Sequence, residues 1–232
     1  MDRRRFLQAA VGAGLAAGVS GSLATRSEAA PAGPQRAASS PEEALALLRA
    51  GNVRYAGGAG WNHDFSAARM TRALGQKPFA AILSCADSRV APELVFDTQP
   101  GELFVCRDAG NFVTDVTTAS LEYGQAVLGV HVILVLGHSA CGAVDAAIEY
   151  VETGKELPGQ LPRLTEAIAP AVKKVRGDAG NLLDNAIASN VRMNVERLSK
   201  ADPILAPAVA SGKLLVVGGV YQIASGEVVL LS

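Results

Sequence analysis

Two short apolar runs constrain the fold of this chain more than any other feature. They occupy residues 79–83 (FAAIL) and 132–136 (VILVL), and each is followed at once by serine or glycine. Uncharged runs of this length are typical of strands that are buried on both faces of a parallel sheet. The sequence therefore predicts two central parallel strands, and the residues that follow them are expected at the same end of the sheet.

Helical patterns between and after these runs place the chain in the α/β class. A further strand is predicted at residues 103–107. Residues 213–221 and 227–231 are joined by a short segment ending in Ser-Gly, and this hairpin spacing predicts an antiparallel edge strand. We expect a central, mostly parallel β-sheet with that edge strand, flanked by α-helices. The main helices are expected at residues 115–127, 142–153, 161–176 and 182–199.

Three potential metal ligands follow the two apolar runs. Cys85 lies two residues after the first run, and His138 and Cys141 lie shortly after the second. Thiolates and imidazole are ligands that zinc prefers, and a set of two cysteines and one histidine leaves a fourth position open for water. An open position is typical of a catalytic site, so the sequence predicts one Zn²⁺ per chain in a catalytic role.

The residues around these ligands resemble the signature of the β-class carbonic anhydrases. Cys85, Asp87 and Arg89 supply the pattern Cys-x-Asp-x-Arg, and His138 and Cys141 supply His-x-x-Cys. Neither motif departs from the family pattern, and the resemblance covers most of the chain. It implies the β-carbonic anhydrase fold and the zinc-dependent, reversible hydration of carbon dioxide to bicarbonate and a proton.

Asp87 and Arg89 are the expected catalytic residues. Asp87 can accept a hydrogen bond from zinc-bound water and so orient it for attack on carbon dioxide. Arg89 can form a bidentate ion pair with Asp87, which fixes the carboxylate and keeps it ionised. In some related enzymes the equivalent aspartate instead binds zinc at lower pH and closes the site, and the sequence carries the residues for both states.

The resemblance also implies three substrate-binding residues. Gln76 stands nine residues before Cys85, where a glutamine in the plant-like members of the family reaches into the active site of the partner subunit. Phe104 and Tyr123 match the spacings at which similar enzymes place aromatic side chains around the carbon dioxide pocket. Without the resemblance, Gln76 would be read as a surface residue and the two aromatic residues as ordinary core. Together they favour the plant-like type with an open, active site.

Three other functions remain compatible with the sequence. A related zinc hydrolase acting on carbon disulfide or carbonyl sulfide would share every ligand. A non-catalytic structural zinc site would need a fourth protein ligand, which Asp87 could supply. A thiol hydrolase could use Cys85 and His138, but Cys141 and the acidic–basic pair would then have no role.

The first 29 residues resemble an export signal of the twin-arginine type. Residues 3–7 (RRRFL) precede an uncharged, Ala- and Gly-rich stretch at 9–23, and residues 27–29 (SEA) offer a small-x-small cleavage site. The apolar stretch is too short and too rich in glycine for a stable membrane anchor. We therefore expect a signal peptide at 1–29, a linker at 30–39 and a catalytic domain at 40–232, with the twin-arginine export machinery as a partner and the periplasm as the destination.

The remaining features bear on partners and on single residues. The chain carries 21 basic and 22 acidic residues, and this balance gives no electrostatic footprint for nucleic acid. Ser40, Pro41 and Glu43 predict a helix start with a capping box, and the resemblance implies that this helix packs on a second subunit in a homodimer or a dimer of dimers. His63 is either a proton shuttle or a solvated loop residue, and Cys106 is expected to be an inert core thiol.

Overall fold

The computed structural model describes residues 36–60 and 69–231. The predicted signal peptide, most of the predicted linker and His63 lie outside these ranges. The structure therefore does not test the predictions made for them. The described elements run in the order α1 (Pro41–Ala56), α2 (Arg69–Ala73), β1 (Ala80–Cys85), α3 (Pro92–Val95), β2 (Leu103–Asp108), α4 (Asp115–Ala126), β3 (Val132–His138), α5 (Gly142–Thr153), α6 (Pro162–Val175), α7 (Leu182–Ser199), α8 (Leu205–Ala210), β4 (Leu215–Tyr221) and β5 (Val228–Leu231).

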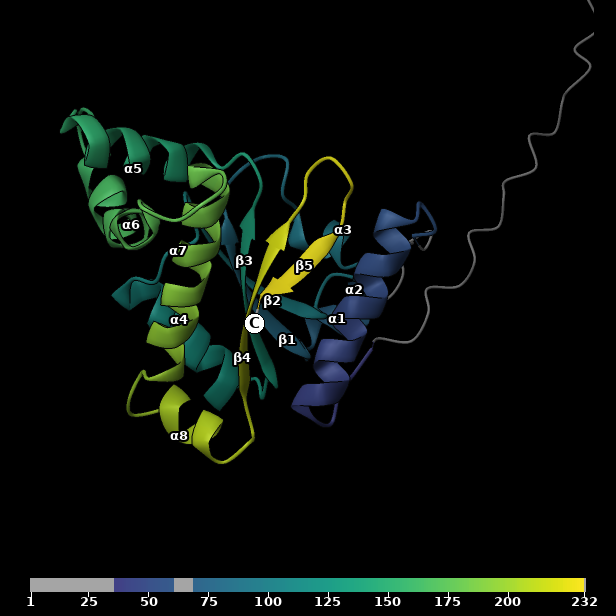
Figure 1. Cartoon of the computed structure of the whole chain (residues 1–232). Coiled ribbons are helices and arrows are strands. Elements are labelled where there is room, and N and C mark those ends of the chain that lie inside the picture. The colour runs from purple at the N-terminus through teal and green to yellow at the C-terminus, as the bar shows by residue number, and fades with distance from the viewer. Residues whose placement is uncertain (1–35, 61–68, 232) are drawn as a thin grey trace, which may run out of the picture.

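A five-stranded sheet in the order β2-β1-β3-β4-β5 forms the centre of the fold (Figure 1). Strand β1 pairs in parallel with both β2 and β3, and β3 pairs in parallel with β4. Strand β5 returns antiparallel to β4 at one edge of the sheet. The predicted α/β class, the mostly parallel sheet and the antiparallel edge strand are therefore confirmed.

Helices cover both faces of the sheet and create two apolar cores. Successive side chains of a strand point to opposite faces, so Leu83 and Val135 face α4 to α8, whereas Ile82 and Leu134 face α1 and α3. Figure 1 shows α1 on one side of the sheet and the group from α4 to α8 on the other. Every residue of β1 and β3 is buried, which explains why these strands read as continuous apolar runs.

Helix α7 packs directly on the sheet at two glycines. A Cβ atom at Gly137 would lie 2.7 Å from Cγ2 of Val191, and one at Gly218 would lie 2.6 Å from Cγ1 of the same valine. Both distances are shorter than Cβ contacts in proteins, so a side chain at either position would force Val191 to move away from the sheet. The close packing brings the polar residues of α7 near the carboxyl end of the sheet.

The structure corrects several boundaries. Strands β1 and β3 each extend two residues beyond the apolar runs, because the ladder continues through the pairs Cys85–Asp108 and His138–Tyr221. The predicted capping box of α1 is wrong in one half: Ser40 Oγ accepts from the Glu43 N–H, but the Glu43 carboxylate accepts from Ser39 instead. Helix α8 was not predicted from the sequence.

Across residues 36–60 and 69–231, none of the helices combines the length and the apolar character needed to cross a membrane.

Candidate metal centre

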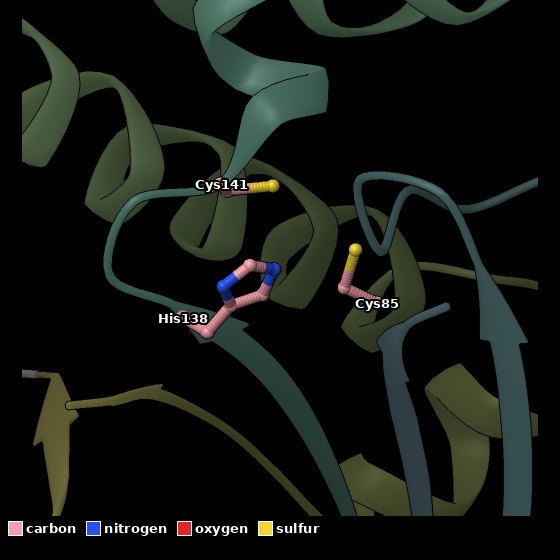
Figure 2. A group of neighbouring side chains, drawn as sticks. All are labelled: Cys85, His138 and Cys141. Atoms are coloured by element: carbon pink, nitrogen blue, oxygen red, sulfur yellow. The ribbon is translucent and has the colours of Figure 1, made fainter. Parts of the chain in front are cut away.

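The three predicted metal ligands lie together at the carboxyl end of the sheet. Cys85 is the last residue of β1, His138 is the last residue of β3, and Cys141 is the N-cap of α5. Their ligand atoms all lie within 4.8 Å of one another, and the side chains point into the same space (Figure 2). Neighbouring parallel strands end side by side, and the short turn after β3 brings Cys141 back over the imidazole. All three residues are buried.

The His138 ring is oriented so that Nε2 faces the two sulfur atoms. Its Nδ1 lies 2.9 Å from the carbonyl oxygen of Ser139, so in the neutral ring Nδ1 donates and Nε2 carries the lone pair. Nε2 is buried and has no hydrogen-bond partner among the described residues. A buried nitrogen without a partner is costly, and a metal ion between the ring and the thiolates would remove that cost.

The two thiols differ in their affinity for protons. The hydrogen bond from Cys141 lowers the pKa of Cys85 to about 4, and the Gly110 N–H, 3.3 Å from Cys85 Sγ, acts in the same direction. The same hydrogen bond to Cys85, together with burial, raises the pKa of Cys141. The N–H groups of Ala143 and Val144 at the start of α5 act to lower the pKa of Cys141, but the adjacent Cys85 thiolate outweighs them.

This donor set fits zinc. Two sulfurs and one imidazole nitrogen converge, and thiolate with imidazole is the combination that selects zinc over the harder divalent cations. A divalent cation would displace the proton that the two thiols share in its absence, because it favours both thiolates at once. Cys85, His138 and Cys141 would occupy three of the four tetrahedral positions around a zinc ion. None of the three would fill the fourth position.

Asp87 and Arg89 form a bidentate ion pair beside the cluster. Arg89 Nε donates to Asp87 Oδ1 at 2.9 Å and Nη2 donates to Oδ2 at 2.7 Å, while the Arg89 backbone N–H also donates to Oδ1. The guanidinium holds the pKa of the Asp87 carboxyl well below its usual range. Asp87 Oδ2 lies 3.8 Å from His138 Nε2, so the carboxylate is within reach of a small molecule at the cluster.

Two further residues build this end of the sheet, and neither was predicted from the sequence. Arg107, the next-to-last residue of β2, donates from Nε to the Cys85 carbonyl at 3.0 Å and from Nη2 to the Asp87 carbonyl at 2.7 Å. Ser139 accepts the Ile223 N–H and so ties the turn after β3 to the segment after β4. The polar segment at residues 107–111 was a sequence signal for Arg107. No sequence signal pointed to Ser139.

The predicted substrate-binding residues lie elsewhere in the same chain. Gln76 is exposed and precedes β1, whereas Cys85 ends β1. The five residue steps along that strand alone span about 16 Å. Phe104 pairs with Ala81, four residues before the level of Cys85. The Tyr123 ring lies 6.2 Å from the Phe104 ring. The structure thus brings the two aromatic residues together, but it places none of the three in the metal cluster of their own chain.

The fold and the site together define an α/β protein with a candidate thiolate–imidazole metal centre. Comparison with known proteins then identifies its family. A family model described as Carbonic anhydrase matches residues 80–228. Carbonic anhydrase 2 of Mycobacterium tuberculosis is 37% identical over 191 residues, which cover 82% of this chain and 92% of that relative. The carbonic anhydrase of Pseudomonas aeruginosa is 40% identical over 162 residues, which cover 66% of this chain and 73% of the relative.

Solved structures share the fold. The β-carbonic anhydrase of Coccomyxa, in complex with acetazolamide, has a TM-score of 0.63 at 31% identity and covers 72% of this chain and 77% of its own. A tetrameric β-carbonic anhydrase of Sordaria macrospora has a TM-score of 0.64 at 27% identity, covering 71% of this chain and 86% of its own. This chain belongs to the carbonic anhydrase family of enzymes, and within it to the β class.

Proposed function

We propose that this protein catalyses the reversible hydration of carbon dioxide to bicarbonate and a proton, with Zn²⁺ held by Cys85, His138 and Cys141. The observation that carries the proposal is the convergence of these three ligand atoms within 4.8 Å, with an ionised carboxylate at the edge of the cluster. Zinc in such a site supplies the Lewis acidity that makes a water molecule nucleophilic near neutral pH.

The acidic–basic pair would direct that chemistry. Asp87 stays ionised because Arg89 holds its pKa low, so Asp87 accepts a hydrogen bond and does not donate one. Arg89 also donates to the Ala140 carbonyl at 3.2 Å, which links the pair to the turn that carries Cys141. A carboxylate fixed in this way can hold one orientation of the attacking oxygen, and this is the role that we assign to Asp87.

We infer that the site works in the open form, the form expected for the plant-like type. Both Asp87 oxygens are bonded to Arg89. The carboxylate would have to leave two charge-assisted hydrogen bonds before it could bind the metal as a fourth ligand. The same pairing argues against a purely structural zinc site, since Asp87 is the residue expected to complete it.

We further propose a homodimer or a dimer of dimers in which Gln76, Phe104 and Tyr123 of one subunit line the carbon dioxide pocket of the other. Their position in one chain supports this, because they lie away from their own metal cluster while Tyr123 is 47% exposed. The related enzyme of Sordaria macrospora is described as tetrameric.

The test of the main proposal is stopped-flow hydration of carbon dioxide by the purified protein, with bound zinc quantified, from mildly acidic to alkaline pH. Activity across neutral pH that is lost on chelation and restored by zinc supports the anhydrase and the open site. Activity only above a steep alkaline threshold would mean that Asp87 closes the site. One zinc per chain with no hydration at any pH would overturn the proposal, and assays with carbon disulfide and carbonyl sulfide would then test the alternative hydrolase.

We also propose that the protein reaches the periplasm by the twin-arginine route, on the strength of the pattern in residues 1–29. The test is cell fractionation of the full chain beside a variant with Arg3→Lys and Arg4→Lys, with the N-terminus of the exported form read by mass spectrometry. Export of the wild type alone, with cleavage after Ala29, is the expected result. Cytoplasmic retention of an uncleaved wild-type chain would refute it.

A further inference from the structure

Two buried amides on α7 have no role in the chemistry described above. Asn190 is 1% exposed and Asn194 is 3% exposed, and the two residues lie one helical turn apart on α7. Buried amide groups are kept only where they are hydrogen-bonded. Their partners therefore indicate what the two residues do.

Both amides bond to the loop that follows β2. Asn190 Nδ2 donates to the Gly110 carbonyl at 2.8 Å, and Asn194 Oδ1 accepts from the Val113 N–H at 2.8 Å. Asn194 Nδ2 in turn donates to Asn190 Oδ1 at 3.1 Å. Because this bond occupies the acceptor of Asn190, its amino group is left to face the loop, and the two side chains act as one unit.

The loop carries a direct contact to a metal ligand. The Gly110 N–H donates to Cys85 Sγ at 3.3 Å, while the carbonyl of the same glycine is held by Asn190. Gly110 has a φ of +94°, and a Cβ atom there would lie 2.6 Å from Ile168 Cδ1. Glycine therefore permits the close approach, and the amide of Asn190 holds the same residue at its carbonyl.

We infer that Asn190, supported by Asn194, is a positioning residue for the metal centre. It holds Gly110 so that the N–H group donates to the Cys85 thiolate. A hydrogen bond to a thiolate withdraws electron density from sulfur, so the ligand donates less charge to the metal and leaves it a stronger Lewis acid. The inference rests on the proposed zinc centre, and it adds a contribution from a helix that supplies no ligand.

The chain offers a matched control. Asn52 on α1 is a third buried amide, 7% exposed, that bonds only to backbone. Its Nδ2 donates to the Val95 and Gly226 carbonyls, and its Oδ1 accepts from the Val228 N–H. Asn52→Leu and Asn190→Leu both remove a buried amide, but only the second releases the loop at Gly110.

The experiment uses the full chain with Co²⁺ in place of zinc and records the sulfur-to-cobalt charge-transfer bands. Asn190→Leu should move these bands to longer wavelength, because a thiolate without its hydrogen bond releases electrons more easily. It should also lower zinc affinity in chelator competition about ten- to a hundredfold. Asn52→Leu should lose stability while leaving both readouts unchanged.

Two further variants change the same amides more conservatively. Asn190→Ser removes the same hydrogen bond with a smaller change and replaces the leucine variant if that one does not fold. Asn194→Ser should shift the bands in the same direction by less, since it acts through the orientation of Asn190. Unchanged bands in the Asn190 variants, or equal shifts in the Asn52 variant, would overturn the inference. A wild-type protein without such bands would overturn the metal centre itself.

Discussion

The two ends of the parallel strands differ in what one chain can build alone. At the carboxyl end, Cys85, His138 and Cys141 converge, and Asp87 and Arg89 already form their ion pair. At the amino end lie the residues that the family resemblance assigns to the substrate pocket: Gln76 precedes β1, and Phe104, near the start of β2, packs against Tyr123. One chain thus brings together by itself the three residues that could hold a metal ion. Its substrate pocket, as we propose it, requires a second copy.

The difference has a geometric cause. Ligands at the ends of adjacent parallel strands are brought together by the register of the sheet, which backbone hydrogen bonds fix within the chain. Gln76 is separated from Cys85 by the length of β1, about 16 Å, and no rotamer of a glutamine spans that distance. Four predictions test this division.

Removal of a ligand should have the largest effect. Cys141→Ala should abolish stoichiometric zinc binding and reduce hydration by more than about a hundredfold, because even the loss of a group that only supports a ligand costs ten- to a hundredfold. Zinc analysis and stopped-flow assays on the same preparation measure both effects. Full zinc occupancy with normal hydration would show that the cluster is not the active site.

Replacement of the carboxylate should separate catalysis from metal binding. Asp87→Asn should keep zinc but lose roughly ten- to a hundredfold in hydration, since the amide no longer pairs with Arg89 as an anion. The pKa of Asp87 is lowered in the folded state, so its ionisation stabilises the fold at pH values above about 4, the pKa of an unfolded aspartate. The stability difference between wild type and variant should therefore be constant from pH 5 to 8 and shrink as pH falls below about 4. A difference that disappeared near neutral pH would contradict the ion pair.

The amino-terminal end is tested by mixing subunits. Gln76→Ala should keep zinc and lose roughly tenfold in hydration, the value of one hydrogen bond to substrate. Co-expression with the Cys141→Ala chain should then raise activity severalfold above the mean of the two separate variants, because a mixed dimer contains one intact ligand set facing one intact Gln76. Activity equal to the mean would show that Gln76 does not act across an interface.

Cys106 should be the least sensitive position. It lies half-buried on β2, and burial raises the pKa of its thiol, so little thiolate is present at neutral pH. Cys106→Ala should leave zinc content and hydration unchanged and cost about 1 kcal/mol in unfolding free energy. Iodoacetamide labelling with peptide mapping checks its low reactivity in the wild type. Rapid labelling of Cys106 would contradict an inert thiol.

Short-range patterns in the sequence determined most of the fold and the ligand set. The runs before Cys85 and His138 are apolar throughout because both faces of β1 and β3 are covered, and this leaves a pattern that can be read without coordinates. The bounds predicted for α5 and α7 agree with the structure. The position of the three ligands at the strand ends followed from the same patterns. The predicted carboxyl-terminal bounds of β1 and β3 were two residues too early, because ladder pairing depends on the backbone and not on side-chain polarity.

The surroundings of the ligands depend on contacts between distant segments of the chain. Arg107 reaches the carbonyls of Cys85 and Asp87 across a strand pairing, and Asn190 reaches the Gly110 carbonyl from a helix eighty residues away in the sequence. Such hydrogen bonds join residues that share no periodicity and no motif. The sequence of one segment therefore does not indicate its contact with the other. The fold also keeps Gln76 away from the cluster. Gln76 is near Cys85 in sequence, but the whole length of β1 separates the two residues in space.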